Sequence, residues 1–333
     1  MGLSKRIPAL IFLAILALVT VVGFATGAWA ADPAPLRVNY SAVSGAFAPL
    51  WLAEERGLFG KYGLAVDLRY VVPRTATQGL LSRTLDIVNP GGEIIEAGLG
   101  GEKVVFIAGI LNRVVFSLFS KPEITRFSDL KGKVLGVTQP GSTTDFTARL
   151  LAQEAGMVPG KDLQILHLQG IPETFASLSQ GVIDAGILSA PVTLKARQAG
   201  FRELVNITEK NIPMIHAAFA TTREFASTNP ERVRQFLQAY VEGLKIAKSD
   251  AEGTKRVIGK YTKMGSADDL EETYRTFLPA WEKVPAVRAA SVQTLLNFAT
   301  HPAARTAKPD QFIDNSFVSE LERSGFIERL YRQ

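Results

Sequence analysis

Apolar and polar positions along the chain follow a two-residue period in short stretches and a helical period in longer ones. The predicted strands are Leu36–Tyr40, Leu64–Val72, Leu85–Val88, Val104–Leu111, Val134–Thr138, Leu163–Leu168 and Ile183–Ile187. The predicted helices between them are Ala48–Arg56, Gln78–Ser82, Ile94–Leu99, Thr143–Ala155, Thr174–Gln180 and Val192–Ala199. This alternation predicts an α/β fold with mostly parallel strands and helices on both faces of the sheet.

Beyond Pro230 the pattern becomes helical throughout. The helices predicted there are Glu231–Lys248, Ala251–Tyr261, Ala267–Ala280, Val287–Phe298 and, as the last one, Val318–Arg323, which ends before Gly325. The C-terminal part therefore differs in construction from the α/β part before it.

One faint internal repeat is present, because Leu81–Asp86 resembles Leu178–Asp184 with one residue inserted. Each copy is predicted to be a helix end, a turn and the start of a short strand. Two explanations remain open at this point. The similarity arises by chance, or the chain has two lobes of like construction that each present a loop to a shared cleft.

The N-terminus has the pattern of a cleavable signal peptide. Lys5 and Arg6 precede the apolar run Ile7–Val22, and small residues flank the end of the segment in Ala28–Ala30. We predict cleavage after Ala30 and export to the periplasm. A transmembrane anchor is the alternative, since the run approaches the length that spans a bilayer. The absence of cysteine excludes a lipid-modified N-terminus.

Composition narrows the class of protein further. The net charge of +5 falls to +3 once Lys5 and Arg6 are removed with the signal peptide. No dense basic run indicates nucleic-acid binding, and no later segment is apolar enough to embed the mature protein in a membrane. Without cysteine, disulfides, zinc–thiolate sites and thiol nucleophiles are all excluded.

Four stretches, in this order and spacing, resemble the SsuA/THI5-like (NMT1) family of periplasmic solute-binding proteins of ABC importers, of the nitrate, sulfonate and taurine type. They are Ala48–Phe59 with Tyr62–Leu64, Ser128–Lys133, Gln180–Ala185 and Phe326–Ile327. The resemblance spans essentially the whole mature chain. Because these motifs belong mostly to the scaffold, they leave the ligand open among sulfonates, nitrate, carboxylates and pyrimidine-like compounds.

The resemblance implies a two-lobed periplasmic-binding-protein fold of type II, a Venus flytrap in which each lobe is a mixed sheet flanked by helices. Lobe I is expected to hold residues 33–118 and 224–333, and lobe II residues 119–219. The chain is expected to cross between them near 116–121 and 217–222. Ligand binds in the cleft and hinge closure traps it.

Ligands of open α/β sheets bind beyond the carboxyl ends of strands, which selects several loops. The first is Ser41–Phe47, where Ser44 and Gly45 can offer backbone N–H groups and Phe47 can stack on a planar ligand. The alternative is a simple strand-to-helix turn with Phe47 in the core. The matching loop Leu188–Pro191 contributes Ser189.

A second candidate loop, Gly141, Ser142, Thr143 and Thr144, precedes a predicted helix. Helix N-termini present unpaired N–H groups and a positive dipole end to anions. The alternative is that Ser142 or Thr143 only caps the helix, although one N-terminus can do both. Asp145, in the first turn, competes with an anionic ligand.

The remaining candidates for ligand contact include two charged residues and a histidine. Gly92 allows close backbone approach, and Glu93 suits an amine or is simply a first-turn residue. Asn112 and Arg113 follow a predicted strand, and Arg113 either clamps an anion or is solvated. His216 lies before the second expected crossing and faces the cleft or packs in the protein.

Catalysis has little support in the sequence. The histidines His167, His216 and His301 are widely separated, and no nucleophile elbow or P-loop occurs. We therefore predict a non-enzymatic, cofactor-free and metal-free binding component that delivers a small organic solute to an ABC permease and its ATPase. The family implies a monomer. Two alternatives are an exported enzyme on the same fold and a ligand-sensing receptor for a membrane sensor kinase.

Overall fold

The computed structural model of the protein describes residues 34–332. The predicted signal peptide, with its cut after Ala30, lies outside these residues. Within residues 34–332, none of the helices combines the length and the apolar character that crossing a bilayer requires.

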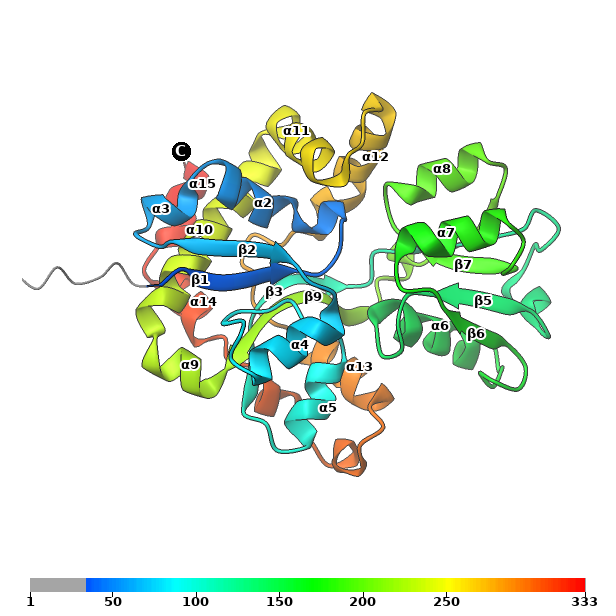
Figure 1. Cartoon of the computed structure of the whole chain (residues 1–333), viewed down its shortest axis with the longest axis horizontal. Helices are drawn as coiled ribbons and strands as arrows, with labels where there is room; N and C mark the ends of the chain where they lie inside the picture. Colours follow the sequence, from blue (N-terminus) through cyan, green and yellow to red (C-terminus); the bar gives the residue numbers. More distant parts are fainter. Residues whose placement is uncertain (1–33, 333) are drawn as a thin grey trace, which may run out of the picture. The chain divides into compact units, whose positions relative to one another are not determined.

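The described residues form nine strands and a larger set of helices (Figure 1). The strands are β1 (Leu36–Tyr40), β2 (Val66–Tyr70), β3 (Val104–Arg113), β4 (Ser117–Ser120), β5 (Val134–Val137), β6 (Gln164–His167), β7 (Ala185–Leu188), β8 (Arg202–Asn206) and β9 (Pro213–Thr222). The α-helices are α2 (Ala48–Glu55), α3 (Leu58–Lys61), α4 (Pro73–Leu81), α5 (Glu93–Leu99), α6 (Thr143–Glu154), α7 (Ile171–Ser179), α8 (Val192–Gln198), α9 (Arg223–Thr228), α10 (Pro230–Ser249), α11 (Ala251–Thr262), α12 (Ala267–Phe277), α13 (Ala289–Phe298), α14 (Ser316–Arg323) and α15 (Phe326–Arg332). Short 3₁₀ segments are η1 (Gly45–Phe47), η2 (Phe127–Leu130), η3 (Thr208–Lys210), η4 (Leu278–Ala280), η5 (Pro302–Arg305) and η6 (Pro309–Phe312).

The first strand group consists of β1, β2, β3 and β9. β1 runs parallel to β2, and β3 runs antiparallel to β9. Two single bridges join these pairs, from Val38 to Ile87 and from Val88 to Ala220. Figure 1 shows α2 and α3 on one side of these strands and α4 and α5 on the other. The predicted strand Leu85–Val88 is thus reduced to the two bridging residues.

The second strand group is a five-stranded sheet in the order β6-β5-β7-β4-β8. β5 pairs in parallel with β6 and β7, whereas β4 runs antiparallel to β7 and β8. The sheet is therefore mixed, as the family resemblance implied, and the prediction of mostly parallel strands is wrong. The cause is that the chain passes from β4 to β5 through residues 121–133, which hold only the short segment η2 and no crossover α-helix that would return the chain in the parallel direction.

Two short segments connect the strand groups, residues 114–116 and residues 207–212. They lie side by side, because the Val114 N–H donates to the Ile212 carbonyl at 3.1 Å and the Thr208 N–H to the Phe116 carbonyl at 3.1 Å. Residues 217–222, where a crossing was expected, lie inside β9 and pair with β3.

The faint sequence repeat corresponds to a repeated hydrogen-bonding unit. The Asp86 N–H donates to the Arg37 carbonyl at 2.9 Å, and the Arg37 N–H returns to the Asp86 carboxylate at 2.8 Å. Asp184 exchanges the same two bonds with Val134, at 2.9 and 3.0 Å. Each carboxylate thus fixes the start of a neighbouring strand, which favours like construction over chance.

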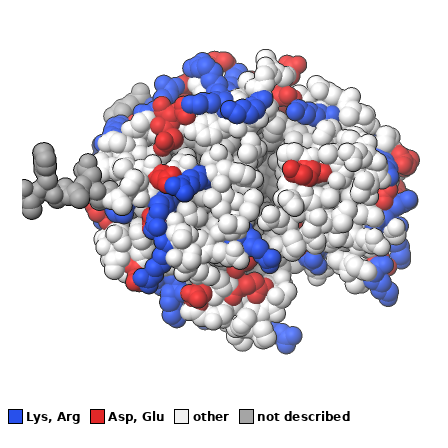
Figure 2. Space-filling model, viewed as in Figure 1, with Lys and Arg blue, Asp and Glu red and all other residues white. Residues whose placement is uncertain are grey.

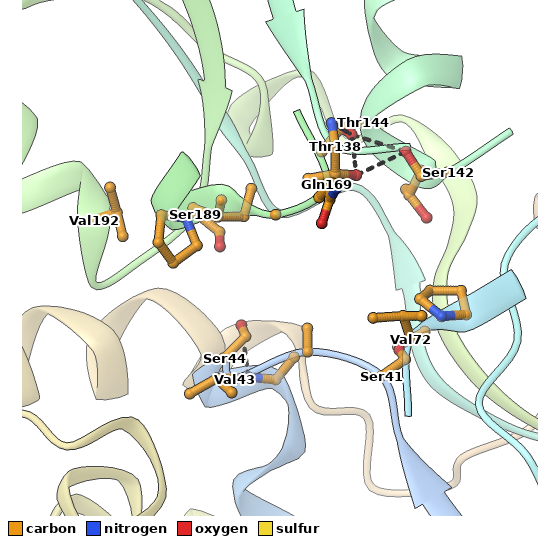
Figure 3. Close-up of a pocket in the computed structure, with 18 of the residues that line it drawn as sticks. Ser41, Val43, Ser44, Val72, Thr138, Ser142, Thr144, Gln169, Ser189 and Val192 are labelled. Carbon is orange, nitrogen blue, oxygen red and sulfur yellow. Dashed lines mark hydrogen bonds between the residues drawn. The ribbon is translucent and has the colours of Figure 1, made fainter. Parts of the chain in front are cut away.

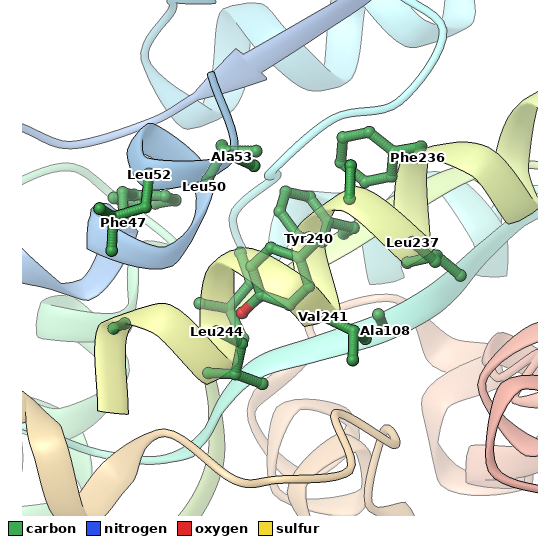
Figure 4. Packing of buried hydrophobic residues seen from close by; sticks show 14 of the residues in the cluster. Phe47, Leu50, Leu52, Ala53, Ala108, Phe236, Leu237, Tyr240, Val241 and Leu244 are labelled. Carbon is green, nitrogen blue, oxygen red and sulfur yellow. The ribbon is translucent and has the colours of Figure 1, made fainter. Parts of the chain in front are cut away.

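The largest hydrophobic core joins α2 to α10 and to β3. Figure 4 shows Phe236, Tyr240 and Leu244 of α10 near Ala108 of β3, with the side chains of α2 beside them. The two helices approach closely at Gly243, where an added Cβ atom would lie 2.3 Å from the Pro49 carbonyl oxygen. Because the polypeptide enters α2 directly from residues 41–47, this contact also anchors that loop.

The bounds of most predicted helices agree with the structure to within a few residues, although α4 begins five residues before the predicted Gln78, and the short helices α3, α9 and α15 were not predicted. The predicted last helix is α14, but the chain continues into α15 after Gly325, which adopts φ +71°. Ile327 and Leu330 of α15 are buried against the first strand group's core. Gly325 therefore ends one helix and redirects the chain, and the apolar positions after it form another.

Candidate functional site

A cavity of about 570 Å³ lies where the ends of β1 and β2, the connecting segments and the first turns of α6, α7 and α8 meet. Its volume is within the roughly 300–1,000 Å³ typical of small-molecule pockets. Figure 2 shows a hollow between the two strand groups, bordered mostly by uncharged side chains on this face. Its walls come from segments far apart in the sequence: Ser41–Ser44, Ala46, Phe47, Tyr70, Val72, Pro73, Pro90, Gly91, Phe116, Thr138, Gln139, Ser142–Thr144, Gln169–Glu173, Phe175, Ser189, Pro191, Val192, Lys195, His216, Ala217, Thr262 and Met264.

The loop after β1 forms one wall, as the sequence predicts (Figure 3). Ser44 lines the pocket and caps η1, its hydroxyl accepting from the Ala46 N–H at 3.4 Å. Phe47 reaches the pocket although only 2% of it is exposed, so it is both wall and core. Gly45 does not line the pocket: a Cβ there would meet the Thr273 side chain at 2.4 Å.

A buried amide network holds this wall in place. Asn39 accepts from the Asn89 N–H at 2.8 Å and donates to the Val71 carbonyl at 2.9 Å. The Asn89 amide donates to the Ala218 carbonyl at 2.8 Å and accepts from the Ser41 hydroxyl. The network therefore ties the ends of β1 and β2 to β9, immediately before Pro90, which lines the pocket.

The start of α6 forms the opposite wall. Ser142 caps the helix, accepting from the Asp145 N–H at 3.3 Å, and it also lines the pocket. Three hydroxyls, those of Thr138, Ser142 and Thr144, are mutually hydrogen-bonded at 2.8–2.9 Å. Thr143 lines the pocket as well, whereas Gly141 only supplies the turn at φ +73°.

Strand β9 supplies an imidazole to the pocket, and the first connecting segment supplies an aromatic ring. The His216 Nδ1 atom accepts from the Val115 N–H at 3.2 Å, and the ring packs against Phe116 at 4.5 Å between centroids. Burial lowers the pKa of His216 to about 4. The imidazole is therefore neutral near pH 7, and its proton is on Nε2, which makes that atom a hydrogen-bond donor at the pocket.

Besides Gly45 and Gly141, four further candidates predicted from the sequence do not line the pocket. Gly92 is buried, donating to the Gly141 carbonyl at 3.2 Å, and Glu93 accepts from the Gly91 N–H at 3.0 Å behind the pocket wall. Asn112 bonds the Ala286 carbonyl at 2.9 Å, and Arg113 the Pro279 carbonyl at 2.6 Å. The reason is that β3 continues through Arg113, so these two residues are strand and not loop.

Pocket residues at the ends of β2 and β6 are not among those predicted from the sequence. Tyr70 and Val72 come from the end of β2, and Gln169 to Glu173 from the turn after β6. Both segments are carboxyl ends of strands, so the rule that selected the other loops would have found them had it been applied to every strand. Lys195, one turn into α8, carries no comparable local signal.

Charge in the pocket is sparse. Among the described lining residues, Glu173 and Lys195 are the charged ones, and both are exposed. Burial, and then the charge of Glu173, raise the pKa of Tyr70, which places this carboxylate near the tyrosine of the opposite wall. Within residues 34–332, no group of three histidine, aspartate or glutamate side chains is arranged to hold a metal ion.

Comparison with known proteins agrees with this architecture. The family model described as NMT1/THI5 like matches residues 44–253. A protein of Brucella abortus (strain 2308), whose name marks it as a candidate binding protein, is 28% identical over 278 residues, which cover 80% of this chain and 84% of that protein.

Two solved structures are similar in fold. The alkanesulfonate-binding protein SsuA from Xanthomonas axonopodis pv. citri, bound to MOPS, superposes with a TM-score of 0.67 at 18% identity, covering 87% of this chain and 98% of that one. The ligand-binding component of an ABC-type import system from Staphylococcus aureus superposes with a TM-score of 0.69 at 15% identity, covering 86% and 98%. The fold is that of the periplasmic binding proteins, and the chain belongs to the NMT1/THI5-like family.

Proposed function

We propose that the protein is the substrate-binding component of an ABC importer, which captures a small organic solute and delivers it to a membrane permease. The observation that carries this proposal is the cavity of about 570 Å³ whose walls come from both strand groups. A ligand there contacts both groups at once, so its binding favours the arrangement that brings them together. The similarity to a component of an ABC-type import system supports the same function.

The lobes of this receptor follow from the connecting segments. Lobe I comprises residues 34–113 and 213–332, lobe II comprises residues 117–206, and the hinge comprises residues 114–116 and 207–212. These bounds shift the second crossing from the expected 217–222, because those residues pair with β3. Hinge closure needs only a few residues that change their backbone angles, and the two connecting segments provide them.

The proposed location, oligomeric state and partners of the protein are supported by its sequence and its family. The mature protein works in the periplasm after loss of its signal peptide, as a monomer that docks on a permease served by an ATPase. Closure aligns the rims of the two lobes, so the permease distinguishes loaded from empty receptor. Capture requires only oriented hydrogen bonds and apolar contacts, without a covalent step.

The test is ligand binding coupled to closure. A broad panel of organic solutes is screened by thermal shift on the mature protein, because a ligand that binds only the folded state raises its melting temperature. Small-angle scattering then measures the radius of gyration with the best binder present. We expect a rise in melting temperature together with a smaller radius of gyration.

Two variants locate the binding in the cavity. Val192→Trp places an indole in the pocket from α8 and is expected to abolish the thermal shift. Val182→Trp is the matched control, because Val182 is 54% exposed and does not line the pocket. A panel without a single binder, or binding that Val192→Trp leaves intact, would overturn the proposal.

A further inference from the structure

Of the helices that begin at or beside the pocket, α5, α6 and α7 each carry a carboxylate in the first turn, whereas α8 does not. Glu93 of α5 accepts from the Gly91 N–H at 3.0 Å, and Asp145 of α6 accepts from the Gly141 N–H at 3.0 Å. Glu173 of α7 lies over Gly170, where an added Cβ atom would be 2.4 Å from its Oε2 atom. In an anion site these N–H groups and dipole ends face the ligand. Here the protein's own carboxylates occupy or border that position.

The positive charge that would offset these carboxylates is scarce. Asp145 is paired with Arg149 at 3.2 Å, but no ion pair within residues 34–332 involves Glu93 or Glu173. Lys195 is the single lysine or arginine among the described lining residues, and its ammonium is exposed at the rim of the pocket. Glu173 is exposed as well, so solvent screens both charges alike, and the described lining carries no net positive charge that would attract an anion. The described lining residues include no arginine, whose guanidinium is the usual bidentate clamp for planar anions.

The remaining lining groups suit an uncharged ligand with a flat ring. Aromatic rings come from both strand groups, including Tyr70, Phe116 and Phe175. Next to them are the side-chain amides of Gln139 and Gln169, which can both donate and accept. Flat rings pack on aromatic faces, and neutral edge groups are satisfied by hydroxyls and amides without desolvating a charge.

We infer that the pocket selects an uncharged organic solute with a flat ring and rejects anions, with Glu173 as the residue that repels them. This inference rests on the proposed function and names the ligand class of the same site. An anionic group about 6 Å from the Glu173 carboxylate in a partly solvated pocket loses roughly three- to hundredfold in affinity.

The experiment uses probes that differ in charge and hardly in shape. Nicotinamide is compared with nicotinate, and benzamide with benzoate, beside uracil, nitrate and ethanesulfonate. Calorimetry at low ionic strength measures the dissociation constants, since salt screens the repulsion. We expect the amides and uracil to bind at least about tenfold more tightly than the anions, and the anions to bind worst in the wild-type protein.

Glu173→Gln tests the residue itself. It keeps the shape and removes the charge, so the preference for amide over carboxylate should shrink by at least about threefold. Glu123→Gln is the control, because Glu123 is exposed in the loop after β4 and does not line the pocket. Equal or tighter binding of an anion, or an unchanged preference in Glu173→Gln, overturns the inference while the receptor function stands. If none of these probes binds, the inference fails, and the broad solute panel decides the receptor function separately.

Discussion

The side chain of Asn89 stabilises the pocket wall through buried hydrogen bonds, and replacing it with alanine tests directly how much these bonds contribute. The residue is 2% exposed, and its amide bonds the Ala218 carbonyl at 2.8 Å and the Ser41 hydroxyl. Asn89→Ala removes both bonds and leaves the buried carbonyl of Ala218 without this donor. The backbone bond from Asn89 to Asn39 remains, so the loop is loosened and not released.

The size of the effect follows from these contacts. Two hydrogen bonds between neutral groups contribute about 1 kcal/mol each, and a buried group left unpaired adds a desolvation cost. We therefore expect the free energy of unfolding to fall by about 2–3 kcal/mol. Because Ser41 and Pro90 line the pocket, ligand affinity should also fall, by roughly three- to tenfold.

Urea unfolding measures the first quantity and calorimetry with a confirmed ligand the second. The control is Asn297→Ala, because Asn297 is exposed and accepts only from the Gln293 side chain at 2.9 Å. That variant should stay within about 0.5 kcal/mol of wild type. If Asn89→Ala were as stable as Asn297→Ala, the amide network would not be what holds the wall.

Two further predictions concern stability. Gly243→Ala should destabilise the protein by about 1–2 kcal/mol, because its Cβ would lie 2.3 Å from the Pro49 carbonyl oxygen and this overpacking outweighs the helix-propensity gain of about 1 kcal/mol. Gly60→Ala is the control and should stabilise the protein, because its added Cβ would meet no neighbouring atom within 4 Å. Urea unfolding that ranked the two variants in the reverse order would refute the packing argument. Burial lowers the pKa of His216 from 6.5 to about 4. As the pH is lowered from 6.5 to 4, His216 is therefore protonated in the unfolded chain before it is protonated in the folded protein, and the free energy of unfolding falls by up to about 3 kcal/mol. This loss of stability at low pH should be smaller in His216→Gln. Equal dependence of the free energy of unfolding on pH in the variant and the wild-type protein would contradict the prediction.

The sequence predicted the pocket loops that directly follow apolar strands. The rule of strand carboxyl ends selected the loops that hold Ser44, Ser142 and Ser189, and all three line the cavity. It failed for Asn112 and Arg113, because antiparallel pairing to β9 extends β3 past the point where its apolar run ends. Strand length is decided by the partner strand, which the local pattern does not contain.

The sequence alone also did not predict which charged residues line the pocket. The sequence predicts Glu93 as a carboxylate in the cleft, but in the structure it accepts hydrogen bonds from Thr77 and Gly91 behind the pocket wall. Glu173 lines the pocket instead, from a turn that the sequence did not predict as part of the site. Lys195 and Tyr70 meet the same cavity from opposite strand groups, 125 positions apart in the numbering. Such encounters depend on how the two sheets face each other.

The sequence by itself therefore determined most of the longer helices, six of the nine strands, the exclusion of disulfides and the family, because periodicity, composition and short motifs are local properties of the chain. The tertiary structure decided which loops meet, that the sheets are mixed, and that carboxylates border a largely uncharged pocket. It did so because these features arise from contacts between residues that are distant along the chain. Bringing such residues together costs loop-closure entropy, which depends on the fold as a whole and not on any local pattern.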